Sequence, residues 1–157
     1  TNQVVINVGL PCSGKTTSTM KVVGDREEWA VLSRDEIVKE LGSKAGFDNY
    51  NDCWDNVDQK EVDRIFQQRK KEIIDQNLNV VIDMTHMSRK SRRKSLSGFP
   101  SNYMKTAAVH MSTLSRIEER NKNRDGKTIP DYVFEKMAMA FYPPLYDEFD
   151  EIKWGFN

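Results

Sequence analysis

One eight-residue segment, directly after a short apolar run, constrains the fold of this chain more than any other feature. Residues 9–16 read GLPCSGKT, and the preceding residues 3–8, QVVINV, are typical of a short buried strand. The segment matches the pattern GxxxxGK(S/T) at every fixed position, and we expect a helix over residues 15–23 directly after it. A glycine-rich turn between a strand and a helix predicts a phosphate-binding loop, the P-loop, at the edge of an α/β sheet.

The fixed positions of this loop each have a physical reason. Gly9 permits a tight exit from the strand, and Gly14 lets the backbone approach a phosphate closely. Lys15 is expected to reach the β- and γ-phosphates, and the Thr16 hydroxyl is expected to ligate Mg²⁺. Cys12 is interpreted as a small residue tolerated in the loop, with a redox-active thiol as the less favoured alternative. We therefore expect ATP and Mg²⁺ to bind here, with the nucleotide contacting Gly9, Pro11, Cys12, Ser13, Gly14, Lys15, Thr16 and Thr17.

The rest of the chain alternates between expected strands and expected helices. Further strands are predicted at residues 30–32, 80–82 and 105–110, with a short one around residues 152–154. Helices are predicted at residues 36–41 (with Gly42 just past the end), 57–77, 89–96, from Thr113 or Ser115 to about Lys122, and from Pro130 to the Pro143-Pro144 pair. Residues 43–55 and the Asp125-Gly126 pair are expected to form loops. This alternation predicts an α/β fold, with a central parallel sheet of about four strands and helices on both faces.

The composition narrows the function classes. The 157 residues carry 24 basic and 24 acidic side chains, so a nucleic-acid site would have to come from a local patch. No apolar run approaches the roughly 20 residues of a membrane helix, and the chain does not open on a signal-like segment. Two cysteines are too few for a disulfide framework or a structural zinc site. We expect one domain over residues 1–157, in a reducing, cytoplasmic compartment and without membrane attachment.

Two aspartates lie directly after expected strands, at the sheet edge that also carries the loop. Asp35 is the best candidate for a general base that accepts a proton from an acceptor hydroxyl, although it fits equally well as the N-cap of the helix from Glu36. Asp83 ends the apolar run 80–82 and is expected to ligate Mg²⁺ together with Thr16, or to position the acceptor; a capping or loop aspartate is the alternative. Arg34 either contacts a substrate phosphate or is solvated.

Two groups of arginines raise the question of an anionic substrate. Arg89, Arg92 and Arg93 share helical spacing and would attract a polyanion, or they form an ordinary solvated face. Arg116, Arg120 and Arg124 recur every four residues, and like charges in such a column repel one another unless phosphates neutralise them. We therefore interpret the second group as a mobile lid over the transferred phosphate, with pairing to Glu118 and Glu119 as the alternative. The isolated His86 and His110 are assigned to neither a metal nor catalysis.

The motifs GLPCSGKTT, SRDEI, VVIDMTHMSRKSRR and RIEERNKNR, the last followed by Pro130, resemble the kinase domain of bacteriophage and bacterial 5′-hydroxyl polynucleotide kinases. These enzymes belong to a wider group of small P-loop kinases that includes zeta-toxin-like and seryl-tRNA kinases. The resemblance extends to about residue 140. It implies a single P-loop kinase domain over residues 1–157, with an arginine-bearing lid, in a bacterial cell or a phage-infected host.

The resemblance also implies residue roles and an activity. Lys15 and Thr16 would bind ATP and Mg²⁺, Asp35 would be the general base, and Arg120 and Arg124 would bind ATP phosphates from the lid. Asp83 or Thr85 would lie beside the acceptor, the 5′-hydroxyl end of DNA or RNA. One departure weakens this assignment, because Val38 stands where the family often has an arginine that binds the acceptor's 3′-phosphate; Lys39 or Arg34 would have to replace it. The alternatives are a P-loop kinase of a small hydroxyl compound, such as a nucleoside or sugar, and a zeta-toxin-like nucleotide-binding module.

Overall fold

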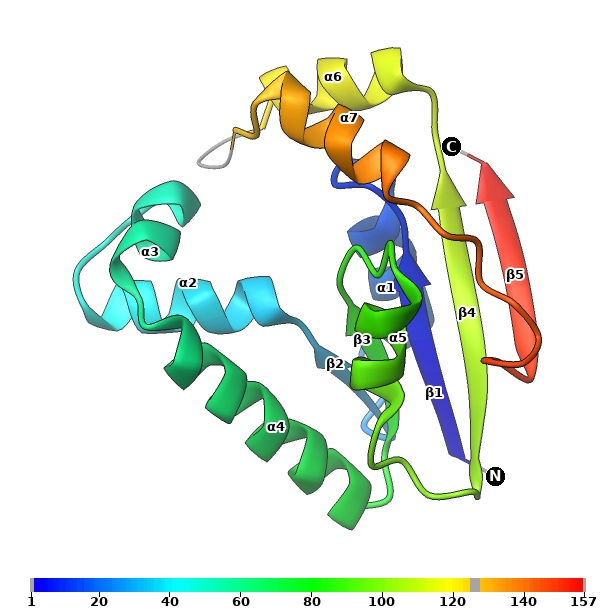
Figure 1. The fold of residues 1–157 in the computed structure, drawn as a ribbon. Helices are drawn as coiled ribbons and strands as arrows, with labels where there is room; N and C mark the ends of the chain where they lie inside the picture. The colour runs from blue at the N-terminus through cyan, green and yellow to red at the C-terminus, as the bar shows by residue number, and fades with distance from the viewer. Residues whose placement is uncertain (1, 125–127, 157) are drawn as a thin grey trace.

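The computed structural model describes residues 2–124 and 128–156, and its centre is a five-stranded sheet (Figure 1). The strands are β1 (Asn2–Val8), β2 (Trp29–Leu32), β3 (Asn79–Asp83), β4 (Tyr103–Met111) and β5 (Glu151–Phe156). Their order across the sheet is β2-β3-β1-β4-β5, and every adjacent pair is parallel. β1 is therefore the central strand, and the loop that follows it lies at the middle of the carboxyl edge of the sheet.

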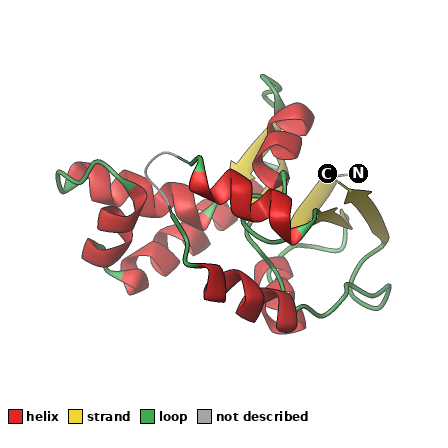
Figure 2. Cartoon of the chain, turned by 90° about the horizontal axis from the view of Figure 1, so that it is seen from above, coloured by secondary structure: helices red, strands yellow, loops and turns green. Residues whose placement is uncertain are grey.

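The helices cover both faces of this sheet. They are α1 (Lys15–Val23), α2 (Arg34–Lys44), α3 (Tyr50–Asn56), α4 (Gln59–Asp75), α5 (Arg89–Leu96), α6 (Leu114–Lys122) and α7 (Asp131–Met139). α1 lies on one face, and α4 and α5 lie on the opposite face (Figure 1). α2 and α3 extend from the β2 side, while α6 and α7 lie above the carboxyl ends of the strands (Figures 1 and 2). The predicted α/β architecture is confirmed, with five strands instead of about four.

The core follows the alternation of side chains along the strands. Val4, Ile6 and Val8 of β1 are fully buried and pack with Val80 and Ile82 of β3. The same cluster contains the apolar side chains of α4, namely Val62, Phe66 and Ile73. Burial of each such side chain contributes roughly 1.5–3 kcal/mol. The sheet edge that carries the polar loops is thus supported by a continuous apolar layer.

Three expectations for the segment between β2 and α4 are wrong. α2 begins at Arg34, before the expected start, and its N-cap is Ser33, whose side chain accepts a hydrogen bond from the Glu36 amide (3.4 Å). Asp35 is therefore not the cap. α2 also continues through Gly42 to Lys44, so this glycine lies inside the helix. Finally, the expected loop over residues 43–55 contains α3, which is packed against α2.

The C-terminal third differs from the expectations in its boundaries. Thr113 caps α6, since its side chain accepts from the Arg116 amide, and Ser115 lies within the helix. Pro130 is the N-cap of α7, not its first residue, and the helix ends at Met139 rather than at the proline pair. The short strand considered near residue 152 is present as β5. The turn predicted at Asp125-Gly126 lies outside the described residues.

None of the helices in the described ranges is long and apolar enough to cross a membrane.

Candidate functional site

The P-loop lies between β1 and α1, and its backbone is bent for a close approach. Gly14 has a φ of 97°, in the left-handed region, and directly precedes the first turn of α1. A Cβ at Gly9 would lie 2.7 Å from the carbonyl oxygen of His110, so no larger residue fits there. Pro11 and Ser13 are buried, whereas Thr16 and Thr17 are exposed at the start of α1. Amide groups at a helix N-terminus attract anions, so this loop has the geometry of a phosphate site.

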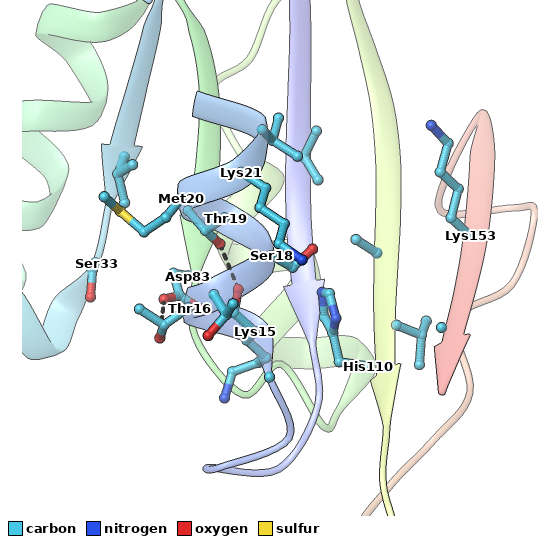
Figure 3. A pocket seen from close by; sticks show the side chains of 18 of the residues that line it. Lys15, Thr16, Ser18, Thr19, Met20, Lys21, Ser33, Asp83, His110 and Lys153 are labelled. Atoms are coloured by element: carbon cyan, nitrogen blue, oxygen red, sulfur yellow. Dashed lines mark hydrogen bonds between the residues drawn. The ribbon is translucent and has the colours of Figure 1, made fainter. Parts of the chain in front are cut away.

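The side chains of Lys15 and Thr16 leave the loop in different directions (Figure 3). The ammonium group of Lys15 donates to the carbonyl oxygen of Leu10 within the loop (3.2 Å). The hydroxyl of Thr16 lies 3.3 Å from Oδ2 of Asp83. A hydroxyl and a carboxylate at this distance are oxygen ligands of the kind that Mg²⁺ prefers in sites completed by substrate phosphates.

Asp83 is held by a buried polar network at the end of the central strands. The side-chain amide of Asn7 donates to Oδ1 of Asp83 (3.2 Å) and also contacts the Thr19 hydroxyl. Oδ1 of Asn7 lies 3.3 Å from Nε2 of His110, and burial, together with repulsion from Lys15, lowers the pKa of His110. Asn7 is buried in β1 and carries this network. This role of Asn7 was not predicted from the sequence, although an amide in an otherwise apolar strand was the available signal.

Asp35 lies in the first turn of α2 and is bound by a residue of α3. The hydroxyl of Tyr50 donates to Oδ1 of Asp35 (2.6 Å). Burial, and next the hydrogen bond to Asp35, raise the pKa of Tyr50, so the phenol remains protonated. Sequence reasoning missed Tyr50 because its segment was expected to be an irregular loop.

Arg34, which precedes Asp35 in α2, is bonded to α4. Its guanidinium donates to Oδ1 of Asp63 (3.1 and 3.2 Å) and lies 5.6 Å from the ring centroid of Trp54. The guanidinium is therefore paired with Asp63 at the surface and is not solvated alone. The bond to Asp63 also occupies the Arg34 guanidinium, which was considered as a ligand of a substrate phosphate.

Two of the three arginines that were interpreted as a lid, Arg120 and Arg124, contact the P-loop. Nη1 of Arg120 donates to the carbonyl oxygen of Cys12 (2.9 Å), and Nη1 of Arg124 lies 3.1 Å from the Cys12 sulfur. α6 ends at Lys122, so Arg124 does not continue a helical column with Arg116 and Arg120. Within residues 2–124 and 128–156, no ion pair joins either arginine to Glu118 or Glu119. Asn121 of α6 connects this helix to the residues before α7. Its side-chain Nδ2 donates to the carbonyl oxygen of Ile129 (2.7 Å), and its Oδ1 accepts from the Ile129 amide (3.1 Å).

The loop after β3, which contains Thr85, is hydrogen-bonded to the start of the P-loop. The carbonyl oxygen of Thr85 accepts from the Gly9 amide (3.0 Å). His86 is buried with a φ of 49°, and its ring nitrogens contact the Asn7 carbonyl (2.6 Å) and the Ser95 hydroxyl (2.8 Å). Thr85 is therefore adjacent to the loop through its backbone.

The basic stretch on α5 is only partly available to a ligand. Arg92 is fully buried, and its guanidinium binds Glu148 (3.0 and 3.3 Å) and the carbonyl oxygens of His86 and Met87. Arg89 forms an ion pair with Asp147. Arg89 and Arg92 therefore pair within the protein and do not form a uniform charged face with Arg93. Lys90, Arg93 and Lys94 remain exposed.

A single cavity of about 1180 Å³ connects these groups. Its lining includes the P-loop, Asp35, Asp83, Arg120 and Arg124, so residues from four separate segments of the sequence meet there. Lys39, one turn beyond Asp35, also lines it, whereas Val38 is fully buried in the core. The cavity thus combines an anion-binding helix start, a carboxylate–hydroxyl pair, a second carboxylate and two guanidinium groups.

Comparison with known structures identifies the same fold in kinases. A chain described in the structure of the Pnkp1/Rnl/Hen1 RNA repair complex superposes with a TM-score of 0.70 at 19% identity, covering 88% of this chain and 43% of that chain. A sugar kinase from Janibacter sp. HTCC2649 gives 0.68 at 16% identity, covering 99% and 86%. A gluconokinase from Sinorhizobium meliloti 1021 gives 0.57 at 15% identity, covering 99% and 82%. At these identities the likeness establishes the fold alone. The chain spans less than half the length of the protein from the repair complex.

No curated protein sequence matches the chain significantly. A family model does: residues 4–144 match the family AAA_33, described as an AAA domain. The matched range begins in β1 and includes the P-loop, both aspartates and both arginines that contact Cys12. With most of its length matched and the P-loop kinase fold in place, the chain belongs to the AAA_33 family of AAA domains.

Proposed function

We propose that this protein is an ATP-dependent kinase that transfers the γ-phosphate of ATP to a hydroxyl group. The observation that carries the proposal is the convergence of the P-loop, the Thr16–Asp83 pair and Asp35 on one cavity. Phosphoryl transfer depends on positioning and charge neutralisation, and a carboxylate near the acceptor takes up its proton. The cavity contains a group for each of these tasks.

The proposed mechanism assigns a role to each group. The triphosphate binds along the P-loop amides and the start of α1, and Lys15 leaves the carbonyl of Leu10 to bind the β- and γ-phosphates. Arg120 and Arg124 neutralise charge that develops on the transferred group. Thr16 and Asp83 would hold Mg²⁺, which would supply positive charge to offset that of the phosphates. Asp35 accepts the proton of the attacking hydroxyl, which approaches the γ-phosphorus in line.

For the acceptor, we propose the 5′-hydroxyl end of DNA or RNA. The motif resemblance described above supports this assignment, as does the structural similarity to a chain of an RNA repair complex. Lys90, Arg93 and Lys94 supply exposed positive charge on α5, and Lys39 lines the cavity beside Asp35. Lysines bind phosphate as point charges, so Lys39 is our candidate for the acceptor's phosphate in place of the arginine that Val38 replaces.

A small hydroxyl compound is the second candidate, and specific observations favour it. Arg89 and Arg92 are engaged with Asp147 and Glu148, and Val38 is buried, so the acceptor side carries less free positive charge than the sequence suggested. A sugar kinase and a gluconokinase share the fold over 99% of this chain. A neutral sugar or nucleoside would need only hydrogen bonds near Asp35.

A phosphate-transfer panel distinguishes these acceptors. The protein is incubated with Mg²⁺ and ATP labelled at the γ-phosphate, together with 5′-hydroxyl oligonucleotides of DNA and RNA, nucleoside 3′-monophosphates, nucleosides or sugars. We expect label on the oligonucleotides, with an acceptor affinity that falls steeply as salt rises; a neutral sugar would show almost no salt dependence. ATP binding without transfer to any hydroxyl would contradict the kinase assignment and favour a nucleotide-binding module.

Two substitutions test the residue roles in the same assay. Lys15→Ala should lower turnover on the order of 10²–10³-fold with an unchanged melting curve, whereas the exposed Lys60→Ala serves as control. Asp35→Asn should lower turnover by roughly 10²–10⁴-fold, because the amide cannot accept the proton. Since Ser33 caps α2, this variant should keep its stability and its affinity for ATP. Normal turnover in Asp35→Asn would place the base elsewhere.

A further inference from the structure

The hydroxyl of Tyr50 donates to Oδ1 of Asp35 at 2.6 Å, across the junction of α2 and α3. We propose that Tyr50 is a positioning residue: its phenol fixes the orientation of the Asp35 carboxylate toward the acceptor hydroxyl. This inference rests on the proposed function, since it assigns to Tyr50 a role in the reaction for which Asp35 is the base.

The structure of α3 fixes the position of Tyr50 independently of Asp35. Asn49 is the N-cap of α3, and its side chain accepts from the Asp52 amide (2.9 Å), so Tyr50 begins the helix. One turn further along, Cys53 is buried against Gly42 of α2. A Cβ at Gly42 would lie 2.1 Å from the Cys53 sulfur, which means that the two helices meet at a distance only glycine allows. The Asn49 cap and the contact of Cys53 with Gly42 therefore hold the Tyr50 phenol beside Asp35.

The phenol acts as a hydrogen-bond donor and not as a second base. Burial and the bond to Asp35 raise the pKa of Tyr50, so it stays protonated throughout the physiological range. A protonated phenol facing a carboxylate oxygen can only donate its proton to that bond. It therefore restricts rotation of the carboxylate group.

Two consequences for the reaction follow. A general base works only within hydrogen-bond reach of the proton that it accepts, and a misplacement of about 1 Å can cost on the order of 10²-fold in rate. A hydrogen bond donated to a carboxylate favours its ionised form, so we expect loss of the Tyr50 donor to make this carboxylate easier to protonate. The charged groups near this hydrogen bond are Arg34, Glu36 and Lys39 on α2 and Arg124 after α6, and the charges of Arg34 and Arg124 act to lower the pKa of Tyr50.

The test compares Tyr50→Phe with Tyr146→Phe in the full chain. Tyr146 is 74% exposed, after α7, and serves as a matched loss of a phenol hydroxyl. We expect Tyr50→Phe to lower kcat by about 10–10²-fold with little change in the KM for ATP. The acid limb of its pH–rate profile should move to higher pH, whereas Tyr146→Phe should match the wild type. In an Asp35→Asn background, Tyr50→Phe should have no further effect on kcat.

A second measurement does not depend on activity. Carbon-13 NMR of the Asp35 carboxyl carbon is followed against pH without nucleotide, and its titration midpoint should rise in Tyr50→Phe. An unchanged kcat and acid limb in Tyr50→Phe would overturn the proposal, as would reduced stability with normal kinetics, because both assign a structural role alone. If the wild type transfers phosphate to no hydroxyl, the proposed function fails. The NMR midpoint then decides whether Tyr50 controls the carboxylate, and an unchanged midpoint overturns that as well.

Discussion

At the residue scale, the loop between β3 and α5 depends on a buried, neutral histidine. His86 is 1% exposed, and burial lowers its pKa to about 4, with the positive charges of Lys15 and Arg92 acting in the same direction. Its Nδ1 faces a backbone carbonyl and must carry the proton, so Nε2 accepts from the Ser95 hydroxyl. The neutral ring satisfies both partners, and this ties the loop to β1 and α5.

The neutral state of His86 makes stability depend on pH. An unfolded histidine has a pKa near 6.5, so the unfolded chain binds a proton below that pH. In the native protein His86 stays neutral until the pH falls to about 4. Stability is therefore complete above about pH 6.5 and falls as the pH is lowered through this window, by roughly 2 kcal/mol between pH 7 and 5. Urea unfolding at a series of pH values measures it.

His86→Asn is the comparison variant, since asparagine tolerates the positive φ and can still donate to the Asn7 carbonyl. It should show a smaller loss of stability between pH 7 and 5. A residual slope of the same sign is expected from His110, whose pKa burial also lowers. Equal slopes in both proteins would show that His86 does not titrate in this range.

At the element scale, the contact between α2 and α3 shapes the acceptor side of the cavity. Alanine normally stabilises a helix interior relative to glycine by roughly 0.5–1 kcal/mol. Gly42 should show the opposite sign, because a Cβ there would lie 2.1 Å from the Cys53 sulfur and 2.9 Å from its Cα.

We expect Gly42→Ala to lower the free energy of unfolding by about 1–3 kcal/mol, as overpacked cores do. The neighbouring exposed Ser43→Ala is the control and should be neutral or slightly stabilising. The midpoint of urea unfolding gives both values. A more stable Gly42→Ala protein would mean that α2 and α3 are not in close contact.

The lid is the second element that bears on function. Arg120 and Arg124 both lie against Cys12, at the tip of the P-loop, so they are already close to the expected position of the phosphates. Their charges should matter most when a triphosphate is bound there.

Arg124→Ala should reduce turnover on the order of 10³-fold, as loss of a charge-stabilising arginine does in phosphoryl transfer. The unfolding free energy of the free protein should stay nearly constant, because Arg124 lies beyond the end of α6. Arg116 is an exposed arginine on α6, and Arg116→Ala should leave turnover near normal. Steady-state kinetics and thermal unfolding test the pair, and near-normal turnover in Arg124→Ala would return this arginine to a surface role.

At the scale of the whole molecule, one buried ion pair joins the middle of the chain to its C-terminal segment. Arg92 is fully buried, and the carboxylate of Glu148 is its charged partner, at 3.0 and 3.3 Å. The same guanidinium binds the backbone of the loop that contains His86. The pair therefore connects α5, the loop after β3 and the segment that leads into β5.

Glu148→Gln should destabilise the protein by about 3 kcal/mol, since it leaves the Arg92 charge buried without compensation. Asp147→Asn removes one of the two carboxylate partners of the more exposed Arg89, which also lies 3.9 Å from Glu148, and should cost less than about 1 kcal/mol. Chemical unfolding of the two variants gives the comparison. Equal, small effects would indicate that Arg92 is solvated in solution.

The sequence by itself determined the class of fold and the position of the P-loop between β1 and α1. The P-loop pattern needs only local order, a strand, a glycine-rich turn and a helix start, and all three occur at the predicted residues. The alternation of apolar runs and amphipathic stretches likewise predicted a parallel sheet, because burial on both faces leaves near-continuous apolar strands. Thr16 and Asp83 meet because Asp83 ends β3, and Thr16 lies at the start of α1, after the loop that follows the neighbouring strand β1.

Only the tertiary structure decided which charged groups are available and what surrounds them. Arg92 looks like a surface arginine in the sequence, yet Glu148, 56 residues away, makes its burial possible. The sequence predicts Gly42 to lie just past a helix end, yet it lies inside α2, where α3 packs against it. The composition of the α3 segment had predicted a loop. Tyr50 reaches Asp35 only through that contact. Local patterns record the preferences of neighbouring residues, whereas ion pairing and close packing depend on partners that the chain brings together only when it folds.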